Sequence, residues 1–449
     1  MSRKVAFLGG GGVRTPLVIF GINEASKHLD VEELVLYDVD RERVEMIAWL
    51  GREVVRRSGG SLRITVAQTP EQAVEGAAFV LNSVRVGGIA TRAHDERAAI
   101  ACGYPGQETT GPGGVAMGQR TIPVAIEQAR LVERRAPGAW IVNFTNPAGL
   151  ITQAISHHSN ARVVGICDTP TEMLHRIQTA LQASEGEVFC DYVGLNHLGW
   201  IRRVMLRGED VTDRVLESNS ILSQFYSAPL FDHDLIRALR LIPTEYLFFY
   251  YSQTRALANQ RRQGSTRGEQ IAQMNEDLSK HLAQHFAVAD AAGALQVYIN
   301  YLNLRSGSYM KLEGEAQSAF ETKIADHDPF RVATGYHRIA LQVMNALCGS
   351  EPERVIVNTR NGATLPDLAD SDIIETTCSI QNDRIETIQM APLPEVVRGL
   401  VLAVKAYERA AIEAAVSGSE RDLRKAMLLY PPIGEWEPSR ELLHAMRWQ

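Results

Sequence analysis

A run of four glycines directly after an apolar segment near the N-terminus constrains the fold of this chain more than any other feature. The apolar residues 5–8 come first, and a second apolar run at 34–37 ends in Asp38. The turn and the helix start between them contain Gly9, Gly10, Gly11, Gly12, Val13, Arg14 and Thr15. A buried strand, a glycine turn, a helix and a second strand that ends in an acid open a dinucleotide-binding βαβ unit. The sequence therefore predicts a Rossmann-type fold.

The same segment predicts the cofactor. The glycines let the backbone approach a pyrophosphate, whose charge is stabilised by the N–H groups of the helix that starts near Arg14. Asp38 can accept hydrogen bonds from ribose hydroxyls and would repel a 2′-phosphate, so NAD is favoured over NADP. Arg41 and Arg43 lie close behind and weaken that preference. An ordinary glycine-rich loop is the alternative, because Arg14 stands where the third glycine of the usual motif belongs.

Length and composition indicate a two-domain protein that binds neither nucleic acid nor membranes. The chain has 449 residues, which is long for a single core, and 45% of them are hydrophobic. Its net charge of −7 gives no attraction to nucleic acid or to an anionic membrane surface. No uncharged apolar run approaches the roughly 20 residues of a membrane span. The five cysteines are an odd number, scattered along the chain, which is typical of a reduced, cytoplasmic protein.

Alternating strands and helices predict a doubly wound, parallel α/β sheet for a first domain, residues 1–190. Apolar, β-rich runs continue at residues 62–66, 78–81, 140–144 and 162–166. From about residue 185 the pattern changes to one extended stretch followed by long helical stretches. Residues 191–449 are therefore expected to form a second, α+β domain that packs against the first over a shared cleft.

Polar residues directly after the predicted strands are the first candidates for a site, because ligands of open α/β sheets bind beyond the carboxyl ends of the strands. Asn82 and Arg85 follow one strand, Asn146 follows another, and Cys167 with Asp168 follows a third. We assign Asn82 and Arg85 to the cofactor.

A cysteine and a histidine further along form a possible metal pair. Cys167 follows a core strand, and His197 lies in the segment 194–197. A thiolate and an imidazole can bind a divalent ion, and two protein ligands leave coordination positions open, as in a catalytic site. The alternative is that Cys167 is a small core residue and that His197 is structural.

Two further segments carry polar or aromatic residues at high density. Residues 106–114 form a glycine-rich stretch that includes Glu108, which we interpret as an exposed, mobile substrate loop or as a solvated connection. Residues 242–251 contain Tyr246, Tyr250 and Tyr251. Such density is typical of a core or an interface, but a tyrosine that faces a cation could act as a base.

Taken in order, these segments resemble the motif series of glycoside hydrolase family 4, whose members use NAD. The matching segments are residues 9–12, Arg92, and residues 106–109, 143–147, 167–170, 194–197, 242–246 and 266–269. Each motif is weak by itself, but eight in the right order are specific, and the resemblance extends to 407–408 and 413–415 near the C-terminus.

The resemblance implies a mechanism. In the family, NAD⁺ oxidises the C3 hydroxyl of the sugar, a base removes the acidified C2 proton, the glycosidic oxygen leaves, water adds and the ketone is reduced again. It implies that Cys167 and His197 hold a divalent metal, usually manganese, that polarises the C3 carbonyl. Tyr246 aligns with the C2 base, and a nearby metal gives a physical reason for a lowered pKa. Asp168 is the candidate general acid at the leaving oxygen.

The resemblance also implies a phosphorylated substrate, either a disaccharide or an aryl glucoside. Arg92, Asn146 and Arg267 align with substrate contacts, including a 6-phosphate, and we place Glu108 and Asp168 in the same substrate site. Asp168 follows the metal cysteine, as in 6-phospho-α-glucosidases, whereas residues 242–247 are closer to 6-phospho-β-glucosidases. We predict the β activity.

Two alternatives stay open at this point. One is the α activity of the same family. The other is an NAD-dependent 2-hydroxy-acid dehydrogenase, because the two-domain plan is similar to that of lactate and malate dehydrogenases. We also expect a homodimer or homotetramer.

Overall fold

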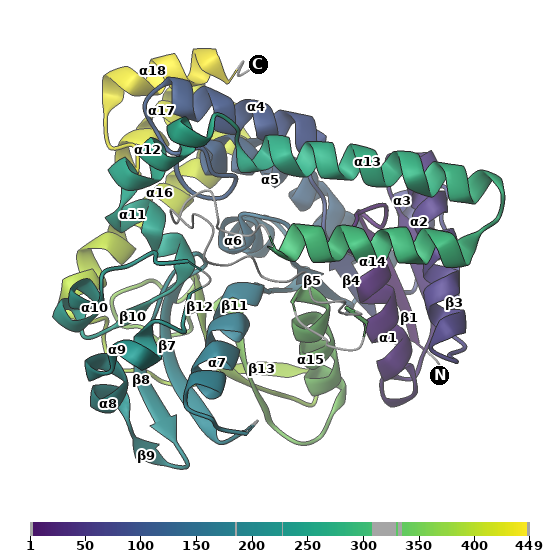
Figure 1. Ribbon diagram of the computed structural model, residues 1–449, viewed down its shortest axis with the longest axis horizontal. Helices are drawn as coiled ribbons and strands as arrows, with labels where there is room; N and C mark the ends of the chain where they lie inside the picture. Colours follow the sequence, from purple (N-terminus) through teal and green to yellow (C-terminus); the bar gives the residue numbers. More distant parts are fainter. Residues whose placement is uncertain (1–2, 185, 227, 308–328, 331–334, 447–449) are drawn as a thin grey trace.

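The computed structural model describes residues 3–184, 186–226, 228–307, 329–330 and 335–446 (Figure 1). Among these residues, nine strands form one sheet in the order β13-β12-β11-β6-β5-β4-β1-β2-β3. Their bounds are β1 Arg3–Leu8, β2 Val31–Tyr37, β3 Arg63–Val66, β4 Phe79–Asn82, β5 Trp140–Asn143, β6 Arg162–Gly165, β11 Glu353–Arg360, β12 Ile373–Gln381 and β13 Arg384–Thr387. Neighbouring strands from β1 to β6 are parallel, in the order 3-2-1-4-5-6 of a Rossmann fold.

The parallel, doubly wound sheet predicted from the sequence is therefore confirmed. Strands β11, β12 and β13 add an antiparallel extension, with Asn358 of β11 opposite Gly165 of β6. These strands belong to the second predicted domain yet complete the sheet of the first. The division at residue 190 stays a prediction.

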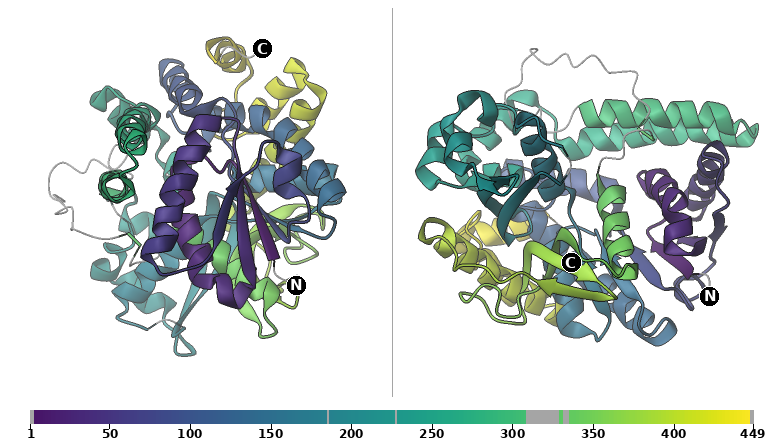
Figure 2. Two further views of the ribbon diagram at one scale, coloured as in Figure 1. Left: turned by 90° about the vertical axis from the view of Figure 1, so that its right-hand side faces the viewer. Right: turned by 90° about the horizontal axis from the view of Figure 1, so that it is seen from below.

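Helices cover both faces of the main sheet (Figure 2). Val5 and Phe7 of β1 pack on one face with α1, α2 and α15, while Ala6 and Leu8 pack on the other face with α3, α5 and α6. The bounds of these helices are α1 Thr15–Leu29, α2 Arg41–Arg57, α3 Pro70–Val74, α5 Gly111–Arg135, α6 Ala148–His158 and α15 Tyr336–Cys348.

A long helical hairpin from the second half of the chain lies against the N-terminal half (Figure 1). It consists of α13 (Arg267–Ala287) and α14 (Ala291–Gly307). Leu278 and Tyr298 of the hairpin pack in one cluster with Leu50 of α2. The Tyr298 hydroxyl donates a hydrogen bond of 2.7 Å to the Val13 carbonyl in the glycine turn. The hairpin thus fixes one end of that turn.

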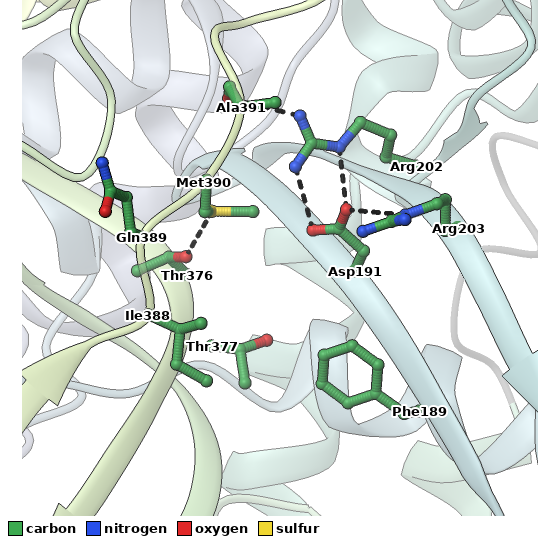
Figure 3. Close-up of a pocket in the computed structure, with 10 residues that line it drawn as sticks. All are labelled: Phe189, Asp191, Arg202, Arg203, Thr376, Thr377, Ile388, Gln389, Met390 and Ala391. Atoms are coloured by element: carbon green, nitrogen blue, oxygen red, sulfur yellow. Dashed lines mark hydrogen bonds and ion pairs between the residues drawn. The ribbon is translucent and has the colours of Figure 1, made fainter. Parts of the chain in front are cut away.

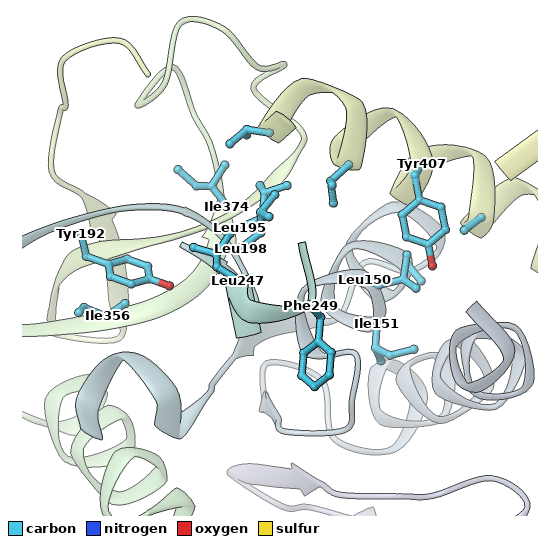
Figure 4. Close-up of a cluster of buried hydrophobic side chains, with 14 of the residues drawn as sticks. Leu150, Ile151, Tyr192, Leu195, Leu198, Leu247, Phe249, Ile356, Ile374 and Tyr407 are labelled. Carbon is cyan, nitrogen blue, oxygen red and sulfur yellow. The ribbon is translucent and has the colours of Figure 1, made fainter. Parts of the chain in front are cut away.

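A smaller antiparallel sheet lies beside the first. It contains β7 (Val188–Leu195), β8 (Leu198–Leu206), β9 (Glu209–Asp210) and β10 (Ile242–Pro243). Its apolar side chains share one core with β11, β12, α6 and α16 (Glu395–Ser417), as Figure 4 shows for Leu195, Ile356 and Tyr407. This shared core fixes the β7–β8 turn, which carries His197, relative to the main sheet.

The remaining helices lie around this core. They are α4 Gly88–Ala101, α7 Asp168–Ala180, α8 Thr212–Glu217, α9 Asn219–Leu222, α10 His233–Leu239, η1 Glu245–Leu247, α11 Phe248–Tyr251, α12 Gln253–Gln263, α17 Glu420–Leu429 and α18 Trp436–Ala445. None of the helices in the described ranges combines the length and the apolar character needed to cross a membrane.

Candidate active site

The glycine turn lies at the carboxyl ends of β1, β2 and β4, as the sequence predicts. Gly9 has a φ of +87°, and a Cβ atom at this position would lie 2.1 Å from the Ser83 carbonyl oxygen, so only glycine fits. The Gly11 N–H donates to Asp38 Oδ2 at 3.0 Å. Helix α1 begins at Thr15, so its first N–H groups face the turn. Asn82, the last residue of β4, is buried close by and accepts a hydrogen bond from Thr145.

The two arginines after Asp38 differ in their contacts. Arg43 Nη2 lies 3.3 Å from Asp38 Oδ1. Arg41 instead donates to the Ala67 carbonyl at 2.6 Å and pairs with Glu45. Only Arg43 therefore pairs with Asp38, the acid at the end of β2. The preference for NAD over NADP stays a prediction.

The cysteine and the histidine that are 30 positions apart in the sequence lie side by side in the fold. Cys167 is the N-cap residue of α7, directly after β6, and His197 lies in the two-residue turn between β7 and β8. Cys167 Sγ is 3.5 Å from His197 Nε2, and both side chains are buried. His197 has a φ of +61°, a left-handed conformation that costs a non-glycine residue about 1–2 kcal/mol.

The chemistry of this pair fits a divalent metal. In zinc sites, bonds of about 2.3 Å to sulfur and about 2.1 Å to nitrogen at a tetrahedral angle place the two donors about 3.6 Å apart. The observed separation of 3.5 Å is close to this value. His197 Nδ1 is buried and has no hydrogen-bond partner among the described residues. No group of three or more His, Cys, Asp or Glu side chains with metal-binding geometry occurs in the described ranges, so the pair would leave positions open for other ligands.

Burial dominates the protonation of both groups. It raises the pKa of the Cys167 thiol, and the charges of Glu375 and Asp168 raise it further. Burial lowers the pKa of His197 to about 3, so the imidazole is neutral at physiological pH. A neutral imidazole can bind a metal, whereas the thiol would release its proton on binding.

Tyr246 contacts the histidine of this pair. Its ring stacks on the His197 ring with a centroid distance of 3.8 Å and an interplanar angle of 20°. Its phenol also interacts electrostatically with Arg92. The neighbouring tyrosines differ, because the Tyr250 hydroxyl is 3.1 Å from that of Tyr430, and burial raises the pKa of Tyr250 and of Tyr251. Of the three tyrosines, Tyr246 is thus the one that stacks on His197.

A cluster of arginines lies next to this site, and two of them pair with the same carboxylate. Glu108 lies 2.5 Å from Arg85 Nη1 and 2.9 Å from Arg92 Nη1. Arg92 also pairs with Glu96 at 2.7 Å. Burial alone would raise the pKa of Glu108, but Arg85 and Arg92 overcome it and hold that pKa at about 2. Glu108 therefore stays ionised and holds both guanidinium groups in place.

Two more arginines bring positive charge to the same region. The pKa of Arg305 on α14 is lowered by burial and then by the charges of Arg14 and Arg92, which shows that these cations crowd together. Arg267, the first residue of α13, donates to the Arg305 carbonyl at 3.1 Å. The region is thus rich in guanidinium groups that could bind an anion.

Asp168 and Asn146 also lie at strand ends, as predicted. Asp168, the first residue of α7, is 3.6 Å from Arg14 Nη1, so the glycine turn reaches the segment of the metal pair. Asn146 follows β5 and is joined to Pro147 by a cis peptide bond. The substrate and catalytic roles assigned to these residues stay predictions.

The glycine-rich stretch 106–114 differs from the exposed, mobile loop that its composition indicated. Gln107, Thr109 and Thr110 are buried, and α5 already begins at Gly111. The Gln107 side-chain oxygen accepts hydrogen bonds from the Thr109 and Thr110 backbone N–H groups. A polar stretch can be buried when its own side chains satisfy its backbone in this way. The interpretation as an exposed loop was therefore wrong.

Glu108→Gln is expected to destabilise the protein strongly, because it removes the counter-charge of half-buried Arg85 and one of the two carboxylates that pair with buried Arg92. The free energy of unfolding should fall by about 3–5 kcal/mol. The exposed pair Glu276–Lys280 is the matched control, and Glu276→Gln should cost at most about 0.5 kcal/mol. The measurement is chemical denaturation of each variant.

The same variant should change the pH dependence of stability. The pKa of Glu108 is about 2 in the folded protein against an ordinary 4.5, so its contribution is complete above pH 4.5 and is lost as the pH falls toward 2. The gap in melting temperature between native protein and Glu108→Gln should therefore be constant near neutral pH and shrink in acid. A gap that is independent of pH down to 2 would contradict the ion-pair assignment.

Several polar residues around this site are not indicated by any of the sequence motifs. Glu375 is a buried carboxylate on β12, and Asn358 and Tyr192 donate hydrogen bonds to it. Burial raises the pKa of Glu375, although these hydrogen bonds oppose that change. An acid inside the β-rich run 373–380 was the available signal. Nothing in the local pattern distinguished Arg305.

A cavity of about 370 Å³ lies elsewhere, between β7, β8, β12 and residues 388–391 (Figure 3). None of the predicted site residues lines it. Its central acid, Asp191, is paired with Arg202 at 2.9 Å and with Arg203 at 3.4 Å. This cavity is therefore separate from the candidate active site.

The fold and the site define an α/β enzyme in which a dinucleotide-type turn meets a buried thiol–imidazole pair. Comparison with known proteins gives the family. The chain belongs to family 4 of the glycosyl hydrolases, because the "Family 4 glycosyl hydrolase" model matches residues 4–183 and the model of the family's C-terminal domain matches residues 192–433. The resemblance inferred from the motif series is thus confirmed.

Similar proteins cover nearly the whole chain. A "probable 6-phospho-beta-glucosidase" of Bacillus subtilis is 29% identical over 99% of this chain and 95% of its own length. A "maltose-6'-phosphate glucosidase" of the same species is 24% identical over 98% of this chain and 94% of its own length. A "6-phospho-alpha-glucosidase" of Leptotrichia buccalis is 23% identical over 95% of this chain and 92% of its own length, so the relatives include proteins named for each anomer.

Solved structures show the same fold. A 6-phospho-beta glucosidase from Thermotoga maritima, solved with manganese, NAD+ and glucose-6-phosphate, has a TM-score of 0.80 and 26% identity over 99% of this chain and 97% of that one. Malate dehydrogenase from Plasmodium falciparum has a TM-score of 0.52 and 12% identity over 92% of this chain and 99% of that one, a likeness of fold alone. The predicted likeness of the fold to that of lactate and malate dehydrogenases is thus confirmed.

Proposed function

We propose that this chain hydrolyses 6-phospho-β-glucosides with the help of NAD and a divalent metal ion, Mn²⁺ in the first instance. The observation that carries the proposal is the contact of three side chains. Cys167 lies 3.5 Å from His197, and Tyr246 stacks on the same imidazole at 3.8 Å. A possible proton acceptor thus stands beside a possible metal site. The Thermotoga maritima relative that contains manganese, NAD+ and glucose-6-phosphate supports both cofactors.

The proposed reaction oxidises the C3 hydroxyl, eliminates the aglycone, adds water and reduces C3 again. Bound NAD would accept the C3 hydride and return it, while the metal ion would polarise the oxygens at C2 and C3. Cys167 and His197 would hold the ion and leave positions open for those oxygens. Tyr246 would remove the C2 proton and return it after water addition. Asp168 would donate a proton to the leaving oxygen.

The arginine cluster supports a phosphorylated substrate. Arg85 and Arg92 share Glu108, and the positive charges of Arg14 and Arg305 lie close enough to affect one another. A phosphate dianion would balance this local charge, and guanidinium groups bind phosphate oxygens through paired hydrogen bonds. The glucose-6-phosphate in the solved relative agrees with such a substrate.

The choice of the β anomer rests on overall similarity. The identity to the relative named for the β activity is 29%, against 24% for the maltose-6'-phosphate glucosidase. Asp168 after the metal cysteine favours the α activity instead. The two activities predict opposite substrate preferences, so one assay separates them.

The test compares p-nitrophenyl 6-phospho-β-glucoside with its α anomer in the presence of NAD⁺, Mn²⁺ and a thiol reductant. We expect turnover of the β substrate that requires NAD⁺ but forms no net NADH, because the hydride is returned. Preferential turnover of the α anomer would overturn the anomer assignment. NADH formation in proportion to product would favour a dehydrogenase instead.

Arg267→Ala is expected to raise KM for the 6-phosphorylated substrate, with a smaller effect on kcat. Arg267 begins the hairpin that carries Arg305, so its charge belongs to the proposed phosphate site. Loss of a charge-assisted hydrogen bond should cost about 1.5–3 kcal/mol, roughly a 10- to 150-fold increase in KM. Arg267→Lys is the control that keeps the charge and loses the planar fork. An unchanged KM in Arg267→Ala would remove this residue from the phosphate site.

A further inference from the structure

A buried carboxylate lies at the centre of a hydrogen-bond network next to the Cys167–His197 pair. Glu375 Oε2 accepts a hydrogen bond of 2.6 Å from the Tyr192 hydroxyl. Its Oε1 accepts from Asn196 Nδ2 and from Asn358 Nδ2, both at 2.9 Å. All three donors are neutral, and within the described ranges Glu375 has no ion-pair partner. A buried carboxylate without a cation is costly, so its retention needs a reason.

The two asparagines connect Glu375 to the two segments that carry the proposed metal ligands. Asn196 directly precedes His197 in the β7–β8 turn, and its Oδ1 accepts from the Gly149 N–H at 3.2 Å. Asn358 lies opposite Gly165, the last residue of β6 and two positions before Cys167. One carboxylate therefore receives a donor from the His197 turn and another from β11, the strand that pairs with the end of β6.

The backbone around the network leaves room for these donors. A Cβ atom at position 199 would lie 1.9 Å from the Tyr192 hydroxyl oxygen, and one at position 165 would lie 2.8 Å from Asn358 Cβ. Glycine at both positions lets Tyr192 and Asn358 approach Glu375. The three hydrogen bonds thus depend on space that the local sequence provides.

Glu375 also brings negative charge close to the pair. Its carboxylate bonds Asn196, which precedes His197, and Asn358, which lies opposite Gly165. Two negative groups, a thiolate and a carboxylate, would repel each other in a buried site unless a cation lies nearby. A divalent ion bound by Cys167 and His197 would supply that cation.

We propose that Glu375 is a positioning residue for the metal site: it aligns the two ligand segments through Asn358 and Asn196, and its negative charge strengthens binding of the divalent ion. The inference rests on the proposed metal role of Cys167 and His197. Groups that orient metal ligands from behind commonly contribute 10- to 100-fold to metal affinity. The role is distinct from catalysis, because Glu375 contacts the ligand segments and no reacting atom is needed to explain it.

The experiment measures Mn²⁺ affinity directly on the full-length protein after removal of metal with a chelator. Mn²⁺ is titrated in, and the unbound ion is followed by its electron paramagnetic resonance signal. Glu375→Gln keeps a side chain of the same size that can bond all three partners, but it removes the charge. We expect its dissociation constant for Mn²⁺ to rise by about 10- to 100-fold, with NAD affinity and melting temperature close to native.

Two further variants separate this role from general damage to the fold. Asp191→Asn removes a buried carboxylate from the same strand as Tyr192, but Asp191 faces the cavity of Figure 3 and pairs with Arg202, so Mn²⁺ affinity should stay native. Asn196→Ala cuts the link between Glu375 and the His197 turn and should weaken Mn²⁺ binding. In the double variant with Glu375→Gln the two losses should not add, because both act through one network.

The outcomes distinguish the inference from the function on which it rests. Loss of Mn²⁺ binding in Cys167→Ser, together with native affinity in Glu375→Gln and in Asn196→Ala, would overturn the role of Glu375 alone. Retention of Mn²⁺ by Cys167→Ser would overturn the metal pair and the inference with it. Should Glu375→Gln fail to fold, the affinity of Asn196→Ala decides the question by itself.

Discussion

Cys167→Ser is expected to abolish Mn²⁺ binding and glycosidase activity while NAD affinity stays close to native. A serine hydroxyl is nearly the same shape as the thiol, but it does not ionise at neutral pH, so the site loses its anionic ligand. The glycine turn lies at the carboxyl ends of β1 and β2, whereas Cys167 follows β6, so the two losses should separate. Metal content, dinucleotide affinity and turnover are measured on the same preparation.

The chain offers a matched control for this variant. Cys190 is also buried, and burial raises the pKa of its thiol to about 12, but its side chain belongs to the apolar core. Cys190→Ser should therefore cost some stability and leave Mn²⁺ binding and turnover intact. Full activity of native protein after exhaustive chelation would contradict the metal assignment.

Tyr246→Phe is expected to lower kcat by roughly 10²- to 10⁴-fold, because it deletes the proposed general base and keeps the ring. The stack on His197 and the core volume are retained, so the melting temperature should change little. KM should move less than kcat, since the phenol acts on the reacting proton. Steady-state kinetics with the 6-phospho-β-glucoside gives both values.

Tyr250→Phe is the matched control, because this tyrosine is four positions further on and its hydroxyl contacts Tyr430. It should retain most of the native kcat. A Tyr246→Phe variant as active as native protein would mean that another group removes the proton, and Tyr250 and Tyr251 would be tested next.

The nucleotide-binding half could be predicted from sequence because its signals are local. The glycines at 9–12 and Asp38 are fixed by a strand, a turn and a second strand that are adjacent in the chain. The carboxyl-end rule for parallel sheets then drew attention to Asn82, Asn146 and Cys167, and all three lie at the ends of adjacent strands. Because the topology of a parallel sheet is regular, the position of a residue after a strand predicts its location in the fold.

The rest depended on contacts between distant segments. Glu375 meets Asn196 across 179 positions, and β11 joins β6 although almost 200 residues separate them. No periodicity within one strand encodes such pairing. The burial of Gln107 could not be predicted for a related reason. It depends on hydrogen bonds that the Gln107 side chain accepts from the Thr109 and Thr110 backbone N–H groups when it folds back onto them. Composition alone indicated an exposed loop.

The most direct test of the proposed mechanism is hydrolysis of a 6-phospho-β-glucoside in deuterium oxide. If Tyr246 removes the C2 proton and exchanges it with solvent before returning it, the glucose 6-phosphate formed should carry deuterium at C2. Nuclear magnetic resonance of the product measures deuterium at this position directly. Glucose 6-phosphate that was not formed by the enzyme serves as the blank. Deuterium at C2 is the predicted result. Product with only hydrogen at C2 would contradict the elimination mechanism, whatever else binds at the site.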